Sequence, residues 1–234
     1  MATTWMTTAE AGEELGVTRS MVRKLLGSGT LLSAGRAGRN LLIDRESVRR
    51  YKNRGSVLGR KWSEKTAWAA LSLISGDIPR WIDANSRYRL KTRIRSMNPE
   101  ELSAAVSTKD RVERYRIHPS GIGNVQDYLL PTGVAALKSS IIASQFHLAA
   151  GSDVAEGYVD QEGALQLIDA FSMIPDPQGN VTMHLVNTME VFGNDGPPTA
   201  AIAVDLMDSL STRERRAGEE SFHKIVFKWL RETQ

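Results

Sequence analysis

The sequence predicts an α+β protein in which a small N-terminal unit of helices and a hairpin precedes a mixed α/β C-terminal domain. Three observations support this fold class. Helix caps, apolar stripes and glycines follow one another through the first fifty residues. Beyond residue 60, segments with strand alternation lie between segments with helical spacing. Residues 1–116 carry 23 Lys and Arg against 12 Asp and Glu, whereas residues 117–234 carry 7 against 15, so the halves differ in charge, at +11 and −8.

The N-terminal unit opens with two predicted helices. Thr7 or Thr8 can cap a helix that ends near Leu15, and Gly16 supplies a tight turn. The second helix has an apolar stripe made of Met21, Val22, Leu25 and Leu26. Its other face carries the polar side chains that would contact the bases and phosphates of a DNA major groove: Thr18, which also caps the helix, Arg19, Ser20, Arg23 and Lys24. A helical hairpin with a solvated basic face is the alternative interpretation.

A basic hairpin and a third helix are predicted next. Residues 31–43 alternate about a Gly-rich centre, and Asp44 can cap a short helix that includes Tyr51. The hairpin tip carries three side chains that would lie beside the phosphate backbone: Arg36, Arg39 and Asn40. Turn glycine, basic helix, hairpin and closing helix in this order resemble the excisionase and MerR-like winged helix-turn-helix family. The resemblance implies that residues 1–56 form a winged helix-turn-helix domain that binds double-stranded DNA.

Composition limits the remaining classes of protein. The chain has 234 residues, of which 41% are apolar, which is enough for a packed core. Because there is no cysteine, disulfides, thiol nucleophiles and zinc–cysteine sites are excluded. No apolar run is long enough for a membrane span, and the N-terminus lacks a secretory signal pattern. We therefore expect a soluble cytoplasmic protein with no membrane partner.

A basic, Trp-rich connecting segment is predicted over residues 60–116. The Gly, Ser and Arg composition between Asn53 and Gly59 indicates a linker before it. Within it, the run RYRLKTRIRSM alternates with a period of two, which fits a half-exposed strand at least as well as a helix. Three interpretations of this run stay open: a solvated face, an auxiliary phosphate-binding surface beside the winged unit, and a docking surface for an acidic partner.

Helices and strands alternate through the rest of the chain. The predicted strands cover residues 111–118 and 181–186, and the predicted helices cover residues 100–106, 163–171, 199–210 and 212–230. Between them, residues 129–148 carry few charges, which suggests a buried strand or helix followed by a helix.

Catalytic chemistry has little support in the sequence. The four histidines lie far apart, without metal-binding spacing, and no phosphate-binding loop, dinucleotide fingerprint or nucleophile elbow occurs. One segment, AAGSDVAEGYVDQEG, has Gly151 and Ser152 ahead of Asp160 and Glu162, which is similar to the metal-binding signature of nucleotidyltransferases. Its spacing is shorter than in that family. We therefore expect no catalytic residues, no metal and no cofactor.

The chain as a whole also resembles a known family. A winged N-terminal unit followed by YRIHPS, GYVDQEGALQLIDAF, PDPQGNVTMHLVN and AAIAVDLMDSLSTRERRAGEESF looks like the AbiEi-type antitoxins. The resemblance implies that the N-terminal domain binds the promoter or operator of its own operon as a repressor. It further implies that the C-terminal domain counteracts a partner nucleotidyltransferase toxin. A homodimer on DNA is compatible with this function.

The −8 charge suggests how residues 117–234 would meet a basic toxin. The preferred docking face consists of acidic residues on the two terminal helices: Asp205, Asp208, Glu214, Glu219 and Glu220. The alternative function is a different DNA-binding transcriptional regulator, whose C-terminal domain senses a ligand or mediates oligomerisation.

Overall fold

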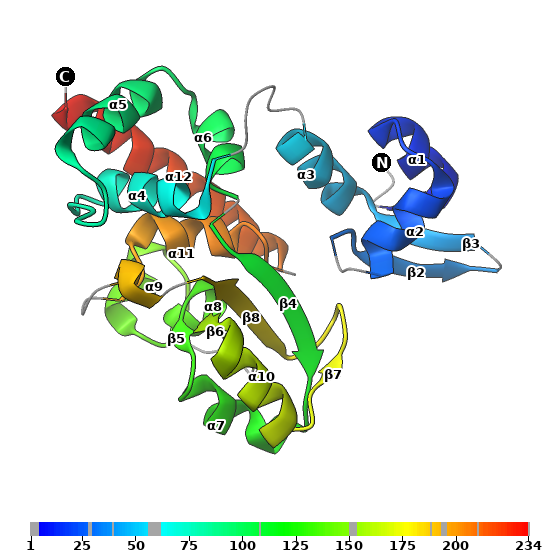
Figure 1. The fold of residues 1–234 in the computed structure, drawn as a ribbon. Coiled ribbons are helices and arrows are strands. Elements are labelled where there is room, and N and C mark those ends of the chain that lie inside the picture. The colour runs from blue at the N-terminus through cyan, green and yellow to red at the C-terminus, as the bar shows by residue number, and fades with distance from the viewer. Residues whose placement is uncertain are drawn as a thin grey trace.

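The structure of the protein is a computed structural model. It describes residues 5–27, 30–38, 40–55, 62–107, 109–149, 154–187, 189–192, 196–209 and 211–233, without the side chains of residues 46, 50 and 53–55. Figure 1 shows two units, each built on its own sheet. The α+β fold class predicted from the sequence is confirmed.

The N-terminal unit packs three helices against a three-stranded antiparallel sheet. In chain order its elements are β1 (Trp5–Thr7), α1 (Thr8–Leu15), α2 (Arg19–Gly27), β2 (Ser33–Ala37), β3 (Asn40–Asp44) and α3 (Arg45–Gly55). Strand β3 lies between β1 and β2. A small core closes the unit and includes Ala11, Val22, Leu25, Leu31 and Ile43. The predicted helices and hairpin are present, whereas β1 had no counterpart in the sequence analysis.

Short-range polar contacts explain where these helices begin and end. The Thr7 hydroxyl accepts a hydrogen bond from the Glu10 amide, and the Glu10 carboxylate accepts one from the Thr7 amide, which makes a capping box. Gly16 ends α1 with φ 66°, a left-handed conformation that glycine adopts without strain. The Thr18 hydroxyl accepts from the Met21 amide at the start of α2, and Asp44 accepts from the Ser47 amide at the start of α3. These caps match the sequence prediction.

The C-terminal unit contains the remaining elements. They are α4 (Glu64–Ile74), α5 (Ala84–Arg95), α6 (Pro99–Val106), β4 (Arg111–Arg116), α7 (Ile122–Gln126), β5 (Leu130–Pro131), α8 (Gly133–Ala136), α9 (Ser140–Gln145), β6 (Ala155–Asp160), α10 (Gln161–Ala170), β7 (Ile174–Pro175), β8 (Val181–Val186), α11 (Thr199–Leu206) and α12 (Thr212–Glu232). Short 3-10 turns occur at Pro119–Gly121 and Met189–Phe192. The predicted strand at residues 181–186 and the helices near the C-terminus are present.

A five-stranded sheet with the order β5-β6-β8-β4-β7 forms the middle layer. Strands β6 and β8 are parallel, and the other pairs are antiparallel. Side chains alternate between the two faces, so Val181 and Met183 of β8 join one core while Val186 joins the other. Helices α7 and α10 cover the first face, and α4, α11 and α12 cover the second (Figure 1).

The boundary predicted between residues 116 and 117 is wrong. Helices α4 to α6 share one hydrophobic core with α11, α12 and the sheet. The indole of Trp68 on α4 lies edge-on to the rings of Tyr158 and Phe192, with centroids 5.1 and 4.7 Å apart. The described residues from Trp62 onward therefore form a single unit, because the apolar side of α4 can be buried only against elements far along the chain. The predicted linker at residues 53–59 overlaps the end of α3, and its remaining part lies outside the described residues.

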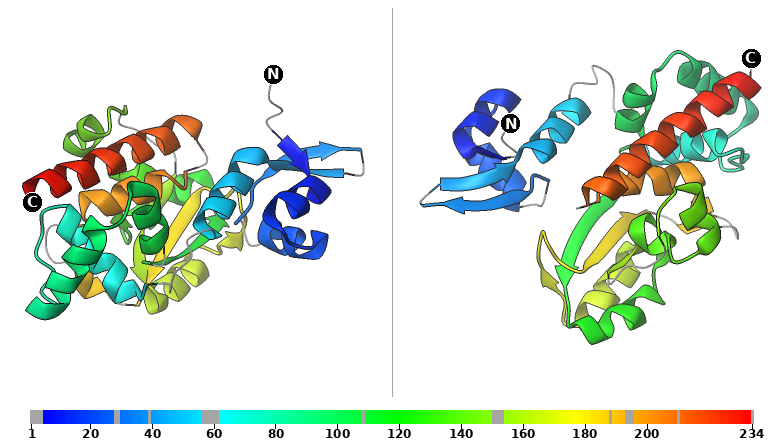
Figure 2. Two further views of the ribbon diagram at one scale, coloured as in Figure 1. Left: turned by 90° about the horizontal axis from the view of Figure 1, so that it is seen from above. Right: turned by 180° about the vertical axis from the view of Figure 1, so that it is seen from behind.

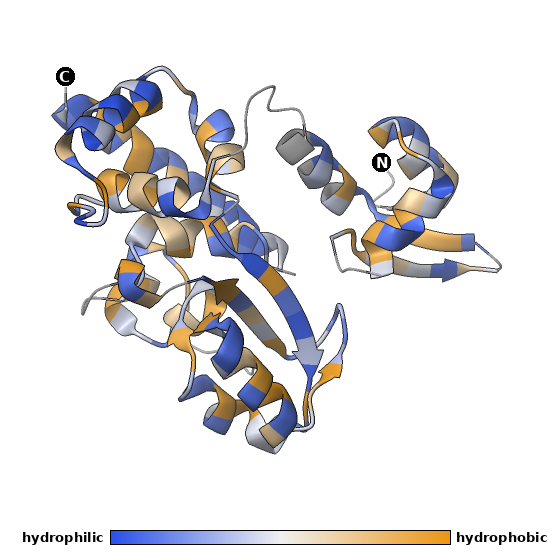
Figure 3. Cartoon of the chain, in the orientation of Figure 1, coloured by the Kyte–Doolittle hydropathy of each residue, from blue (hydrophilic) through white to orange (hydrophobic). Residues whose placement is uncertain are grey.

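The basic run is helix α5 and not a strand. Leu90 and Ile94, four residues apart, are its buried positions, and Figure 3 shows the rest of α5 as mostly hydrophilic. Three of its arginines have contacts within the unit. Arg87 donates to the Ile82 carbonyl oxygen at 2.6 Å, the Arg93 guanidinium lies 4.8 Å from the Trp62 ring centre, and Arg95 donates to a backbone oxygen near the C-terminus. These contacts favour a solvated, structural role for the run over a phosphate-binding surface.

Helix α11 lies at the centre of the unit, and α12 packs along it. Seven of the eight residues of α11 are buried. The close approach depends on Gly218 of α12, where an added Cβ would lie 2.6 Å from the Ala203 carbonyl oxygen. This contact fixes which face of α12 points away from the core. Among the described residues, no helix is both long enough and apolar enough to cross a membrane.

Candidate nucleic-acid interface

Helix α2 presents a polar face to solvent. Val22 and Leu25 are buried and Leu26 is half-buried, whereas the residues predicted to contact DNA are all exposed: Thr18, Arg19, Ser20, Arg23 and Lys24. Met21 departs from the predicted apolar stripe, because its side chain is 37% exposed. It therefore lies beside the basic residues, where an apolar side chain can contact a thymine methyl group. The face has the composition needed for both base and phosphate contacts.

The cations of this face have no ion-pair partner among the residues that the structure describes. In the described part of the chain, Arg19, Arg23 and Lys24 form no ion pair, and the same is true of Arg36 in the hairpin. A guanidinium that is already paired must break that contact before it binds a phosphate. Unpaired, exposed cations instead give up only water and counterions, and counterion release is what drives binding to a duplex.

The hairpin β2–β3 provides the second part of the interface. Ala37 pairs with Asn40, and Gly38, which follows Ala37, has φ 59°. Arg36 and Asn40 are exposed at the tip, while Arg39 lies outside the described residues. Both views of Figure 2 show this hairpin extending away from the C-terminal unit. Its tip is therefore accessible to a duplex that contacts α2.

We expect the hairpin to contact phosphate and not bases. Arg36→Ala should therefore weaken binding to all DNA sequences alike and lower the slope of log affinity against log salt by about one. Binding titrations at several salt concentrations, with an operator and with an unrelated duplex, measure both effects. A slope equal to that of the parent protein, or a loss confined to the operator, would contradict this assignment.

The C-terminal unit contains a group of buried ionisable residues that the sequence analysis missed. We call it the buried charge cluster, and it consists of Lys109, Asp110, Glu156, His184 and Asp205. The Lys109 ammonium lies 2.6 Å from Asp205 Oδ1 and also contacts Asp110. His184 Nδ1 lies 2.7 Å from Asp110 Oδ2, and its Nε2 lies 3.1 Å from Glu156 Oε1. The two cations therefore bridge three carboxylates from different parts of the chain.

Neighbouring residues complete the hydrogen bonding of the cluster. Hydroxyl groups of Thr132 and Tyr158 donate to Asp205, the first at 2.6 Å. The Val134 amide donates to Glu156 Oε2 at 2.8 Å. Gly133 is required next to it, because its φ is 49° and an added Cβ would lie 2.3 Å from the same oxygen. Buried charges are stable only when their hydrogen-bonding capacity is met, and this environment meets it.

Both cations of the cluster are charged at neutral pH. Burial by itself would lower the pKa of His184, but the Asp205 charge and the hydrogen bond and charge of Asp110 raise it to about 10. Burial likewise opposes a charge on Lys109, yet Asp110 and Asp205 raise its pKa. Burial would raise the pKa of Asp110, but the Lys109 charge and the His184 hydrogen bond lower it. The cluster thus works as one electrostatic unit.

The cluster includes three residues that could hold a metal ion, namely Asp110, His184 and Asp205. The Lys109 ammonium already supplies a positive charge against both carboxylates. The side chains of these four residues are at most 5% exposed. A protein cation at a site closed to solvent favours a structural role for these residues over metal binding. The sequence signal for it was the single aspartate in the otherwise apolar helix AAIAVDL.

The nucleotidyltransferase-like segment takes a different form. Gly151 and Ser152 lie outside the described residues. The Asp160 carboxylate accepts a hydrogen bond from the Gly163 amide and caps α10, and Glu162 lies in the first turn of that helix. Both acidic residues therefore have an ordinary helix-capping environment.

The predicted acidic docking face does not exist as one surface. Asp205 is only 1% exposed and belongs to the buried charge cluster, so it cannot meet a partner. The reason is that α11 is buried on nearly all sides, which helical spacing alone did not reveal. Glu214 accepts a hydrogen bond from the Ser209 hydroxyl at the start of α12, and Glu220 pairs with Arg216 at 2.8 Å. Asp208 is half-buried, and Glu219 remains exposed.

A comparison with protein families identifies the N-terminal unit. A family model described as a helix-turn-helix domain matches residues 5–56, which extend from β1 to the end of α3. The comparisons with curated proteins and with solved structures give no match. The family match covers less than half of the chain. With the geometry of α2 and the hairpin, it defines a DNA-binding helix-turn-helix protein and supports a role in transcription regulation.

Proposed function

We propose that the protein is a sequence-specific repressor that binds the operator of its own operon and acts as the antitoxin of a nucleotidyltransferase toxin. The observation that carries the first part is the exposed basic face of α2, which forms no ion pair with the described residues and lies beside a basic hairpin. A helix-turn-helix protein reads bases with such a face and holds the phosphate backbone with neighbouring cations. Two copies on a palindromic operator would suit this function.

The antitoxin part rests on different observations. It is supported by the resemblance of the C-terminal segments to AbiEi-type antitoxins and by the net negative charge of residues 117–234, which complements a basic, nucleic-acid-acting toxin. We further propose that the C-terminal unit performs no catalytic step. The buried charge cluster is consistent with this, since its carboxylates are already satisfied by protein cations.

Control of the toxin can be tested with the full-length protein, provided that the experiment separates toxin control from DNA binding. A neighbouring nucleotidyltransferase gene is expressed from an unrelated promoter, together with either the parent protein or a variant with Arg19, Arg23 and Lys24 replaced by alanine. We expect both proteins to restore growth, because the unrelated promoter removes repression as a route to rescue. Circular dichroism checks that the variant is folded.

Two results would contradict the antitoxin proposal. One is the absence of a nucleotidyltransferase gene beside this one. The other is continued toxicity in the presence of the folded parent protein. Rescue by the parent but not by the folded variant would show that toxin control needs the DNA-binding face. Metal-dependent nucleotide transfer by the purified protein, abolished by Asp160→Ala with Glu162→Ala, would overturn the non-catalytic assignment.

A further inference from the structure

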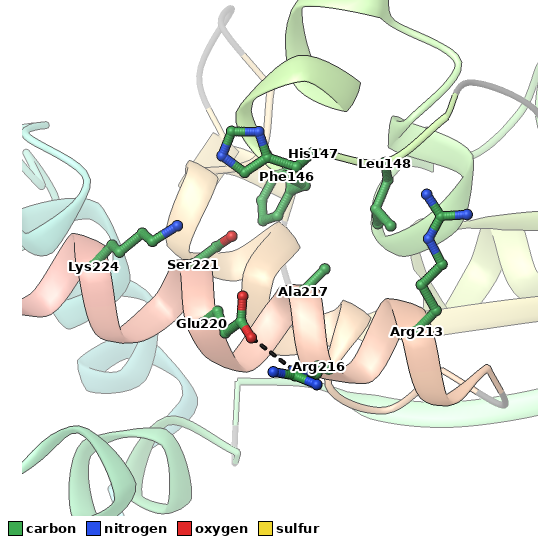
Figure 4. Close-up of a pocket in the computed structure, with 9 residues that line it drawn as sticks. All are labelled: Phe146, His147, Leu148, Arg213, Arg216, Ala217, Glu220, Ser221 and Lys224. Carbon is green, nitrogen blue, oxygen red and sulfur yellow. Dashed lines mark hydrogen bonds and ion pairs between the residues drawn. The ribbon is translucent and has the colours of Figure 1, made fainter.

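A surface cavity of about 310 Å³, open to solvent, lies between α12 and the turn that follows α9. Figure 4 shows its lining. Phe146 and Leu148 supply apolar surface from the turn, and one face of α12 supplies Arg213, Arg216 and Lys224. This volume is at the lower end of the range in which proteins bind small organic ligands.

The cavity concentrates positive charge in a negative part of the chain. Residues 117–234 contain 7 Lys and Arg against 15 Asp and Glu, and three of the seven cations line this cavity. They are Arg213, Arg216 and Lys224, at spacings of three and eight residues along α12. A helix repeats every 3.6 residues, so these positions share a face. The face is the one left uncovered when Gly218 packs against α11.

Only part of this positive charge is neutralised within the protein. Glu220 is the single carboxylate in the lining, and Arg216 pairs with it at 2.8 Å. Arg216 lowers the pKa of Glu220 by hydrogen bond and by charge, and Lys224 and His147 add to this. Arg213 has no hydrogen bond or ion pair within the described part of the chain. An anion that entered the cavity would therefore meet one unpaired guanidinium and a surplus of positive charge.

The turn opposite α12 has an unusual backbone. His147 has φ 53°, a conformation that residues other than glycine rarely adopt. The turn buries Phe146, which is 2% exposed, and leaves His147 exposed at the cavity rim, across from Glu220 in Figure 4. Backbone strain of this kind is often found at binding sites. The cavity thus combines a cationic wall, a polar rim and an apolar floor.

We propose that this cavity binds a small phosphate-bearing molecule, with its phosphate on the Arg213 guanidinium and its organic part against Leu148 and Ala217. Arginine forms paired hydrogen bonds with phosphate oxygens, and lysine adds a mobile positive charge. The cavity is larger than a phosphate ion needs, so an organic phosphate should bind more tightly than inorganic phosphate. The proposal does not depend on DNA binding or on a toxin, and it would make the C-terminal unit a ligand-sensing domain.

The test measures binding of three probes to the full-length protein by isothermal titration calorimetry at constant ionic strength. They are inorganic phosphate, AMP and adenosine, which lacks the phosphate. We expect AMP to bind more tightly than inorganic phosphate, and adenosine not to bind. The variant with Arg19, Arg23 and Lys24 replaced by alanine should bind AMP like the parent protein, which excludes phosphate binding by α2.

Three further variants test the lining residues, and the expected changes in AMP affinity differ in direction among them. Arg213→Ala combined with Lys224→Ala should weaken AMP binding at least about tenfold, because the charge-assisted hydrogen bonds of Arg213 and the positive charge of Lys224 are both lost. Glu220→Gln should strengthen it severalfold by removing the only negative charge of the lining. Lys228→Ala, which removes a cation of α12 outside the cavity, should have no effect.

The proposal is overturned if neither inorganic phosphate nor AMP binds, or if the folded double variant binds AMP as tightly as the parent protein. It is also overturned if the double variant loses affinity for a DNA duplex while the parent binds no small phosphate. In that case the cationic face of α12 is an additional DNA contact.

Discussion

The full-length protein with Arg19, Arg23 and Lys24 replaced by alanine is expected to lose at least about a hundredfold of its affinity for its operator. Each side chain that contacts a guanine contributes about 1–3 kcal/mol, and each phosphate contact adds an electrostatic component. The three residues are exposed and without ion-pair partners in the described part of the chain, so their loss should leave the fold intact. Gel shifts with the region upstream of the operon, beside an unrelated duplex, measure the effect.

A variant with the same change in charge provides the control. Lys138, Lys228 and Arg231 are exposed on the C-terminal unit, and their replacement by alanine also removes three positive charges. This variant should keep nearly full operator affinity. If both triple variants lose affinity equally, the protein binds DNA through its overall charge. If neither loses affinity, α2 is not the DNA-binding helix and the solvated-face interpretation holds.

Lys109→Met is expected to lower the free energy of unfolding of the C-terminal unit by about 3–5 kcal/mol, because removing one member of a buried ion pair leaves its partners uncompensated. Methionine is unbranched like lysine and only one atom shorter, so the change mainly removes the charge. Asp110 and Asp205 would then face each other with only His184 as a buried cation. Denaturant unfolding followed by tryptophan fluorescence reports on this unit, since four of the five tryptophans belong to it.

Lys228→Met is the matched control for this measurement. Its ammonium lies 3.9 Å from Glu232, and both side chains are largely exposed, so water screens the pair. Its loss should be hardly measurable. A decrease below about 1 kcal/mol for Lys109→Met would mean that the buried charge cluster does not stabilise the unit. A decrease of equal size for both lysines would point to a general effect of net charge.

The N-terminal unit was predictable because its signals are local. Thr7, Thr18 and Asp44 cap helices through atoms no more than three residues away, and Gly16 adopts the left-handed conformation that the turn requires. Strand β8 was predictable for a similar reason, since alternation over six residues already indicates a strand with one face toward each core.

Predictions failed where burial depended on distant elements. Helix α5 has a period-two charge pattern that fits a half-exposed strand at least as well as a helix, but Leu90 and Ile94 pack on the core of the C-terminal unit, and that burial decides in favour of the helix. The boundary predicted between residues 116 and 117 was wrong for the same reason. Nothing within residues 60–116 shows that Trp68 packs against Tyr158 and Phe192.

The sequence by itself determined the presence of a helix-turn-helix unit, its exposed basic face and the charge contrast between the two halves, because caps, periodicity and composition act over a few residues. Only the tertiary structure decided the environment of Asp205, which contacts Lys109 and Thr132 in the interior and is not available to a partner. It also decided that Arg213 and Lys224 share a cavity with a turn near residue 147. These contacts join residues more than sixty positions apart, and such pairings are set by how the layers pack.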